Sequence, residues 1–206
     1  MVATSNCAKF MSNFGMKHWL AGLRILQYLI QRSGLPLVYV SIGDELNCIL
    51  VAETDASHAD CPDTARGRAG YVIYNSGAIV DAKTEMLKAV HPSTAASEQT
   101  ALANCVLRVL AARNLMVDFG FLQFDPTFIG EDNMACLLNS KNPVCSRKAR
   151  HLHIAHHLTR ENQMEFKTIN VQRVATGDMS ADLQTKNLGT NLHNRHTARQ
   201  MGHSCL

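Results

Sequence analysis

The sequence predicts an α/β fold with one mixed five-stranded sheet flanked by helices. Two observations carry this prediction. Three strand-like runs follow one another from residue 49 onward with turn residues between them, which is typical of an antiparallel meander. From Ser93 onward the pattern changes to helix, strand, helix, helix, strand and helix. A meander followed by alternating helices and strands favours one sheet with helices packed against it.

Each element rests on a local pattern. In residues 17–31, Trp19, Leu20, Leu23, Leu26 and Ile30 recur at steps of three and four, which predicts a helix. Ser93 or Thr94 is a suitable cap for a second helix that runs to about Leu115. The remaining expected elements are strands at 49–54, 70–74, after the turn 75–77, at 126–129 and at 165–174, with helices to about Ser140, at 149–163 and at 178–186.

Composition points to one globular domain with appendages. The chain has 206 residues, of which 46% are hydrophobic and 18% charged. No stretch approaches the roughly 18 apolar residues of a membrane span, so we expect no membrane partner. The seven cysteines are odd in number and form no C-x-x-C pair, which indicates reduced thiols in an intracellular protein.

Positive charge is concentrated in the last third of the chain. The net charge is +3, but residues 141–206 carry 10 basic and 4 acidic side chains and seven of the ten histidines. This favours a polyanion such as nucleic acid as a partner, although a solvated basic face is an alternative. The first acidic residue is Asp44, a bias that a mitochondrial transit peptide would also show. We expect a cytoplasmic or nuclear location, with mitochondrial targeting as the weaker alternative.

Acidic residues follow two of the expected strands. Asp55 and Asp132 lie where open α/β sheets bind their ligands, at the carboxyl ends of strands. If Glu98 in the long helix faces the same edge, three carboxylates converge, and their repulsion is relieved by a cation between them. Oxygen ligands of this kind select Mg²⁺ or Mn²⁺. The alternative is that each residue is an unrelated surface acid or helix cap.

Seven motifs in order resemble the ribonuclease H domain that ends the polyprotein of copia-type retrotransposons. The resemblance extends from about Lys17 to His203, and the early helix resembles the connection between the polymerase and the nuclease of that family. The motifs are Thr54-Asp55-Ala56, Cys61-Pro62-Asp63-Thr64, Gly70-Tyr71-Val72-Ile73, Ser93-Thr94-Ala95 with Glu98, Glu131-Asp132-Asn133, Lys141-Asn142-Pro143-Val144 with Ser146-Arg147, and Ala181-Asp182 with Thr185-Lys186.

The resemblance implies a ribonuclease H-like sheet and hydrolysis of the RNA strand of an RNA–DNA hybrid. The catalytic and metal-binding residues of the family fall on Asp55, Glu98, Asp132 and Asp182. Two Mg²⁺ ions, with Mn²⁺ as a substitute, would activate water and stabilise the leaving oxygen. Asp55 would bridge both ions, Glu98 and Asp132 would hold one, and Asp182 the other. The implied context is a retrotransposon polyprotein with a reverse transcriptase domain.

The sequence departs from the family pattern around these acids. Ser57 replaces the second acid of the first motif and Ala96 replaces the first glutamate of the fourth. His58, Gln99 and Gln184 replace tryptophan, tyrosine and leucine, and these changes suggest relaxed packing around the site. Two alternatives therefore stay open. The chain could be a catalytically eroded nucleic-acid-binding or interaction module, or a DNA-cutting relative with the same fold.

Basic residues after residue 140 are candidates for contacts with hybrid phosphates. The residues predicted to bind nucleic acid are Arg147, Lys148, Arg150 and Lys186. His153 and His157 are four residues apart on one expected helix, a spacing that zinc could use, but no H-E-x-x-H glutamate or cysteine pair accompanies them.

We expect three parts along the chain. They are a connection segment at 1–45 that includes the helix 17–31, a ribonuclease H-like domain at 46–190, and a basic carboxyl-terminal tail at 191–206.

Overall fold

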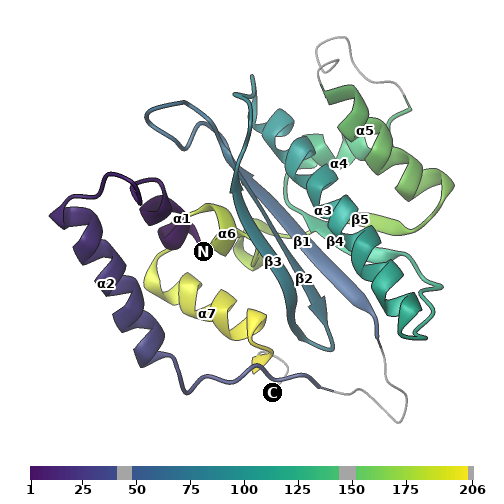
Figure 1. Cartoon of the computed structure of the whole chain (residues 1–206). Helices are drawn as coiled ribbons and strands as arrows, with labels where there is room; N and C mark the ends of the chain where they lie inside the picture. Colours follow the sequence, from purple (N-terminus) through teal and green to yellow (C-terminus); the bar gives the residue numbers. More distant parts are fainter. Residues whose placement is uncertain (41–47, 144–151, 204–206) are drawn as a thin grey trace.

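A five-stranded sheet forms the centre of the protein, as a computed structural model shows for residues 1–40, 48–143 and 152–203 (Figure 1). The strand order is β3-β2-β1-β4-β5. β1 pairs antiparallel with β2, and β2 with β3, whereas β4 lies parallel to both β1 and β5. The predicted mixed sheet is confirmed. Its strands are β1 Leu50–Ser57, β2 Arg68–Asn75, β3 Ala78–Met86, β4 Thr127–Glu131 and β5 Ile169–Arg173.

Helices cover both faces of the sheet (Figure 1). The bounds are α1 Val2–Ala8, α2 Met16–Gln31, α3 Thr94–Asp118, α4 Met134–Lys141, α5 His153–Arg160, α6 Asp182–Thr185 and α7 Thr190–Gln200. One face packs against α3, with Leu102, Val106 and Val109 meeting Ile73 and Ile129 in a common core. The other face carries a smaller apolar cluster, in which Val72 and Tyr74 meet Met179 and Ala181.

α3 is the helix that organises the larger core. Ser93 caps it, as predicted, because its side chain accepts a hydrogen bond from the backbone N–H of Ala96 at 3.3 Å. Within the described part of the chain, this helix is also the one long and apolar enough to cross a membrane. That is weak evidence, because a core helix of a soluble protein passes the same test.

Strand pairing brings the two predicted strand-end acids to one edge of the sheet. β1 and β4 run in parallel, with Ala52 opposite Ile129. Asp55 near the carboxyl end of β1 and Asp132 directly after β4 therefore lie at the same edge of the sheet. Gly70 of β2 lies opposite Asp55, and a Cβ there would stand 2.3 Å from the Cβ of Gln184. The missing side chain thus lets α6 lie close to the sheet beside Asp55.

Three segments differ from the sequence prediction. The helix expected at 178–186 is wrong in extent, because only Asp182–Thr185 is α-helical and a 3₁₀ turn occupies Thr176–Asp178. Between them the backbone N–H of Ser180 donates to the Glu53 carboxylate instead of to a helical carbonyl. α1 and α7 had no predicted counterpart, and α7 buries His196 and Gln200 inside the segment expected to be a basic tail.

The other predicted elements have structural counterparts. The helix 17–31 corresponds to α2, and the helix 149–163 corresponds to α5 followed by a π-helical turn at Glu161–Glu165. Residues 149–151, and the expected boundary between residues 45 and 46, lie outside the described residues. The division of the chain into three parts stays a prediction.

Candidate metal centre

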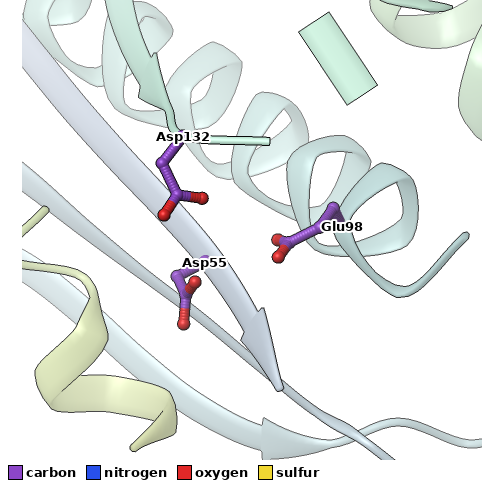
Figure 2. A group of neighbouring side chains, drawn as sticks. All are labelled: Asp55, Glu98 and Asp132. Carbon is purple, nitrogen blue, oxygen red and sulfur yellow. The ribbon is translucent and has the colours of Figure 1, made fainter. Parts of the chain in front are cut away.

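Three carboxylates converge at the carboxyl ends of β1 and β4 (Figure 2). Asp55 comes from β1, Glu98 from the start of α3, and Asp132 from the residue after β4. One oxygen of each side chain lies within 4.8 Å of the others. Asp55 and Glu98 are buried, and Asp132 is partly buried. The structure therefore brings together three of the four acids that the sequence predicts at one site.

Two capped helices hold these acids in place. The Ser93 cap begins α3 so that Glu98 lies near its amino-terminal end, facing the sheet (Figure 2). Asn133 caps α4, because its side-chain oxygen accepts from the backbone N–H of Cys136 at 3.1 Å. Asp132 therefore lies in the short link between β4 and a fixed helix start. Both acids are positioned by local hydrogen bonds as well as by the sheet.

Asp182 reaches the site through Lys186. The Lys186 ammonium lies 2.9 Å from Oδ1 of Asp55 and 2.7 Å from Oδ1 of Asp182, so it bridges the two carboxylates. The Thr185 hydroxyl also donates to Oδ2 of Asp55. Burial opposes the charge of Lys186, but Asp55 and Asp182 outweigh it and raise the lysine pKa. The fourth predicted acid is thus adjacent to Asp55, with a cation of the chain itself between them.

Glu98 is the most perturbed acid of the cluster. Burial, followed by the charges of Glu131, Asp55 and Asp132, raises its pKa to about 10. Among the described residues, its buried Oε2 has no hydrogen-bond partner. A buried carboxylate oxygen without a donor is costly unless the group is protonated or a cation binds it.

Two further carboxylates of the region are also harder to ionise than usual. Burial raises the pKa of Glu131 to about 8, against the hydrogen bond that it accepts from the backbone N–H of Asn133 at 3.0 Å. Burial and the charge of Asp55 raise the pKa of Asp182 to about 6, although its bond with Lys186 acts in the opposite direction. The region therefore carries more negative charge than Lys186 alone can neutralise at alkaline pH.

The donor set fits a hard divalent cation. The converging atoms are carboxylate oxygens, which suit Mg²⁺ and Mn²⁺ better than zinc. The unpartnered Oε2 of Glu98 supplies an independent sign, because an ion in the cluster would satisfy it. Asp55, Glu98 and Asp132 are the residues that could hold such an ion. A second ion at Asp55 and Asp182 would have to displace Lys186.

The other predicted binding residues have mixed outcomes. Arg147, Lys148 and Arg150 lie outside the described residues, so their predicted phosphate contacts stay predictions. The predicted contact of Lys186 with nucleic acid also stays a prediction, and the structure shows its ammonium paired with acids. His153 and His157 approach each other, with 3.1 Å between their Nε2 atoms. No third metal ligand joins them among the residues that the structure describes.

Of the positions that depart from the family pattern, Gln99 and Gln184 are buried and partly bonded, whereas His58 is exposed. Oε1 of Gln99 accepts from the Cys136 thiol at 3.8 Å, but its Nε2 has no partner in the described part of the chain. Oε1 of Gln184 accepts from the Thr84 hydroxyl at 3.1 Å. Nδ1 of His58 lies 3.4 Å from the Ser97 hydroxyl. Asp55 and Glu98 converge with these replacements present, and Gln99, whose Nε2 lacks a partner among the described residues, is the residue next to Glu98.

Sequence reasoning missed two buried glutamates. Glu131 precedes Asp132 in the fifth motif and raises the pKa of Glu98. Glu53 lies in the middle of β1, fully buried, where its carboxylate meets Ser180 and Arg199. A charged residue inside an apolar strand pattern was the available signal, because such a residue is rarely buried without a partner.

The chain is similar in sequence to two plant transposon proteins. It is 28% identical over 173 residues, or 83% of this chain, to the retrovirus-related Pol polyprotein from transposon RE2 of Arabidopsis thaliana. It is 28% identical over 188 residues, or 90% of this chain, to the corresponding polyprotein from transposon RE1. The chain spans 12% of the length of each relative. No family model matches the chain.

A solved structure shares the fold. LC11-RNase H1, isolated from compost by a metagenomic approach, superposes with a TM-score of 0.52 at 10% sequence identity. The match covers 66% of this chain and 92% of the other. The shared region is therefore nearly the whole of that protein, and the two proteins share this mixed-sheet fold.

Proposed function

Because the chain is homologous to retrovirus-related Pol polyproteins and has the ribonuclease H fold, we propose that it is a metal-dependent endonuclease. Its substrate would be the RNA strand of RNA–DNA hybrids. In the parent polyprotein it would act beside a reverse transcriptase domain. The seven motifs that resemble copia-type ribonuclease H domains support this substrate.

One observation carries the proposal. Asp55, Glu98 and Asp132 place carboxylate oxygens within 4.8 Å of one another, and the buried Oε2 of Glu98 lacks a donor. Carboxylates gathered this closely in a buried site repel one another unless they are protonated or a cation lies between them. A fold that only presents a basic surface to nucleic acid needs no such cluster.

The acidic residues would bind two metal ions at two neighbouring positions. Asp55, Glu98 and Asp132 would hold one Mg²⁺ ion, while Asp55 and Asp182 would hold the second after Lys186 moves away. Ions there would supply an activated water and stabilise the leaving oxygen of the scissile phosphate. Asp55 faces both positions, because it belongs to the cluster and also pairs with Lys186 beside Asp182.

Cleavage of a labelled hybrid by Asp132→Asn tests this function. The substitution keeps the shape and removes one charged ligand, so cleavage in Mg²⁺ should fall by orders of magnitude while hybrid binding persists. Asp118→Asn is the matched control, because Asp118 is exposed at the far end of α3. Single-stranded RNA and double-stranded DNA should stay intact. Preferential nicking of double-stranded DNA would favour the DNA-cutting alternative, and unchanged cleavage by Asp132→Asn would contradict the site.

Lys186 favours a second candidate, a nucleic-acid-binding module without catalysis. Its ammonium already bridges Asp55 and Asp182, and so could replace the second ion permanently. The unpartnered Nε2 of Gln99 next to Glu98 points the same way. In that case the wild-type chain would bind hybrid in Mg²⁺, Mn²⁺ or chelator alike, without cleavage in any of them.

A further inference from the structure

A buried polar network lies on the sheet face that packs against α6 and α7. Its centre is Glu53, which has no exposed side-chain area. Glu53 and Asp55 are two residues apart on β1, so they lie on the same face of the sheet. The network is therefore next to the candidate metal centre and distinct from its acids.

Glu53 binds the segment that leads to α6. Its Oε2 accepts from the backbone N–H of Ser180 at 2.7 Å and from the Ser180 hydroxyl at 2.6 Å. The Tyr74 hydroxyl also contacts the Ser180 hydroxyl. The Ser180 side chain and amide are thus fixed by side chains of β1 and β2.

α7 completes the network from the carboxyl-terminal side. Arg199 forms an ion pair with Oε1 of Glu53, and its Nη1 donates to the backbone carbonyl of Asp178 at 2.6 Å. Nε2 of Gln200 donates to the backbone carbonyl of Ser180 at 3.0 Å. Two neighbouring residues of α7 therefore hold both sides of one turn.

The turn fixed in this way presents Asp182. Ser180 is two residues before Asp182, whose own N–H donates to the carbonyl of Met179 at 3.3 Å. An apolar residue would fill the place of Glu53 at lower cost, because burying a charge requires its desolvation. What an ion pair supplies better than apolar packing is a defined geometry.

We propose that Glu53 and Arg199 are positioning residues that hold Asp182 next to Asp55, so that α7 is a functional part of the metal centre. This inference rests on the proposed function, since Asp182 is taken as a ligand of the second ion. Glu53 and Arg199 do not belong to the carboxylate cluster of Asp55, Glu98 and Asp132. They act through Ser180 on the turn that carries the Asp182 carboxylate.

The test compares two arginines of the same helix in the full chain. Arg199→Gln breaks the ion pair with the fully buried Glu53, whereas Arg195→Gln breaks an exposed pair with Asp178. Binding of Mg²⁺ and Mn²⁺ alone is measured by calorimetry and, for Mn²⁺, by electron paramagnetic resonance. We assign to Asp182 the bound ion whose binding is lost in the Asp182→Asn variant. Melting in chelator reports the purely structural effect of each variant.

Arg199→Gln should weaken the Asp182-dependent ion about tenfold, the loss expected for a charge-assisted hydrogen bond. The ion at Asp55, Glu98 and Asp132 should keep its affinity, and Arg195→Gln should bind both ions like the wild type. Equal ion affinities in Arg199→Gln and Arg195→Gln would overturn the proposal, whatever the melting temperatures.

Ser180→Ala provides a second variant that keeps the ion pair. It removes only the hydroxyl that donates to Glu53, so it should fold and weaken the same ion by a few-fold. If Arg199→Gln does not fold, wild-type ion binding by Ser180→Ala overturns the proposal.

A wild-type chain that neither cleaves hybrid nor binds an Asp182-dependent ion would contradict the proposed function itself. Normal wild-type behaviour with unaffected variants would contradict only the positioning role.

Discussion

Glu98→Gln should stabilise the metal-free protein at neutral pH. Glutamine keeps the shape of the protonated carboxyl group and removes its ionisation. The pKa of Glu98 is raised from an ordinary 4.5 to about 10, so the folded state binds a proton that the unfolded state releases above pH 4.5. The contribution of Glu98 to stability is therefore full at low pH and is lost progressively as pH rises.

The magnitude follows from this proton uptake. At pH 7, about 2.5 units above the ordinary pKa of 4.5, the folded state still keeps Glu98 protonated. This lowers the free energy of unfolding by at most about 3 kcal/mol relative to low pH. For a chain of this size, that corresponds to an increase of roughly 10 °C in the melting midpoint of Glu98→Gln. At pH 4.5 the cost is nearly absent, so the two proteins should melt at similar temperatures.

Thermal melts in chelator at pH 4.5 and pH 7 measure the difference directly. Asp118→Asn, an exposed acid on the same helix, serves as the control and should match the wild type at both pH values. A difference between Glu98→Gln and wild type that is equal at pH 4.5 and pH 7 would refute the reasoning, because it would not come from ionisation.

Magnesium should narrow the difference in stability between the two proteins without reversing it. With a dissociation constant of about 1 mM, 10 mM Mg²⁺ stabilises the wild type by roughly 1.4 kcal/mol, and Glu98→Gln should lose most of that gain. Sodium chloride at matched ionic strength should reproduce none of it. An equal gain from Mg²⁺ in both proteins would mean that Glu98 holds no ion.

Two further predictions concern the basic residues. Lys186→Met should lower the melting midpoint in chelator, because Asp55 and Asp182 then face each other without a cation, and it should enlarge the stabilisation by Mg²⁺. Melts with and without Mg²⁺ measure both effects. An unchanged midpoint in chelator would contradict the bridging role of Lys186. Charge reversal at Arg147 and Lys148 should weaken hybrid binding and flatten its dependence on salt, measured by fluorescence anisotropy; an unchanged salt slope would remove both residues from the interface.

The sheet and the acidic cluster were accessible from the sequence because their signals are local. Alternating residues and turn residues indicate strands, and parallel strands align their carboxyl ends, so Asp55 and Asp132 were expected together. Glu98 followed from the Ser93 cap and from the motif that contains it. Each of these steps needs only neighbouring residues and one general rule of sheet geometry.

The network around Glu53 depends instead on contacts between distant residues. Ser180 and Arg199 are 127 and 146 residues away from Glu53 along the chain. Helical periodicity at 178–186 favoured one continuous helix, but the bond from the Ser180 amide to Glu53 competes with helix formation there. Tertiary contacts therefore overrode a local preference at the segment that places the fourth acid.

Lys186 shows why residue type alone does not determine a role. Its place in a basic carboxyl-terminal region favoured a contact with phosphate. Because it follows α6 directly, four residues after Asp182, its ammonium instead lies next to two carboxylates. The same ammonium lowers the repulsion that Asp55 and Asp182 would otherwise experience. Either a second ion or the Lys186 ammonium can therefore lie between Asp55 and Asp182, but not both. Because the charges of Asp55 and Lys186 also affect the pKa values of Glu98 and Asp182, ion binding at this position and the protonation of these two acids must depend on each other.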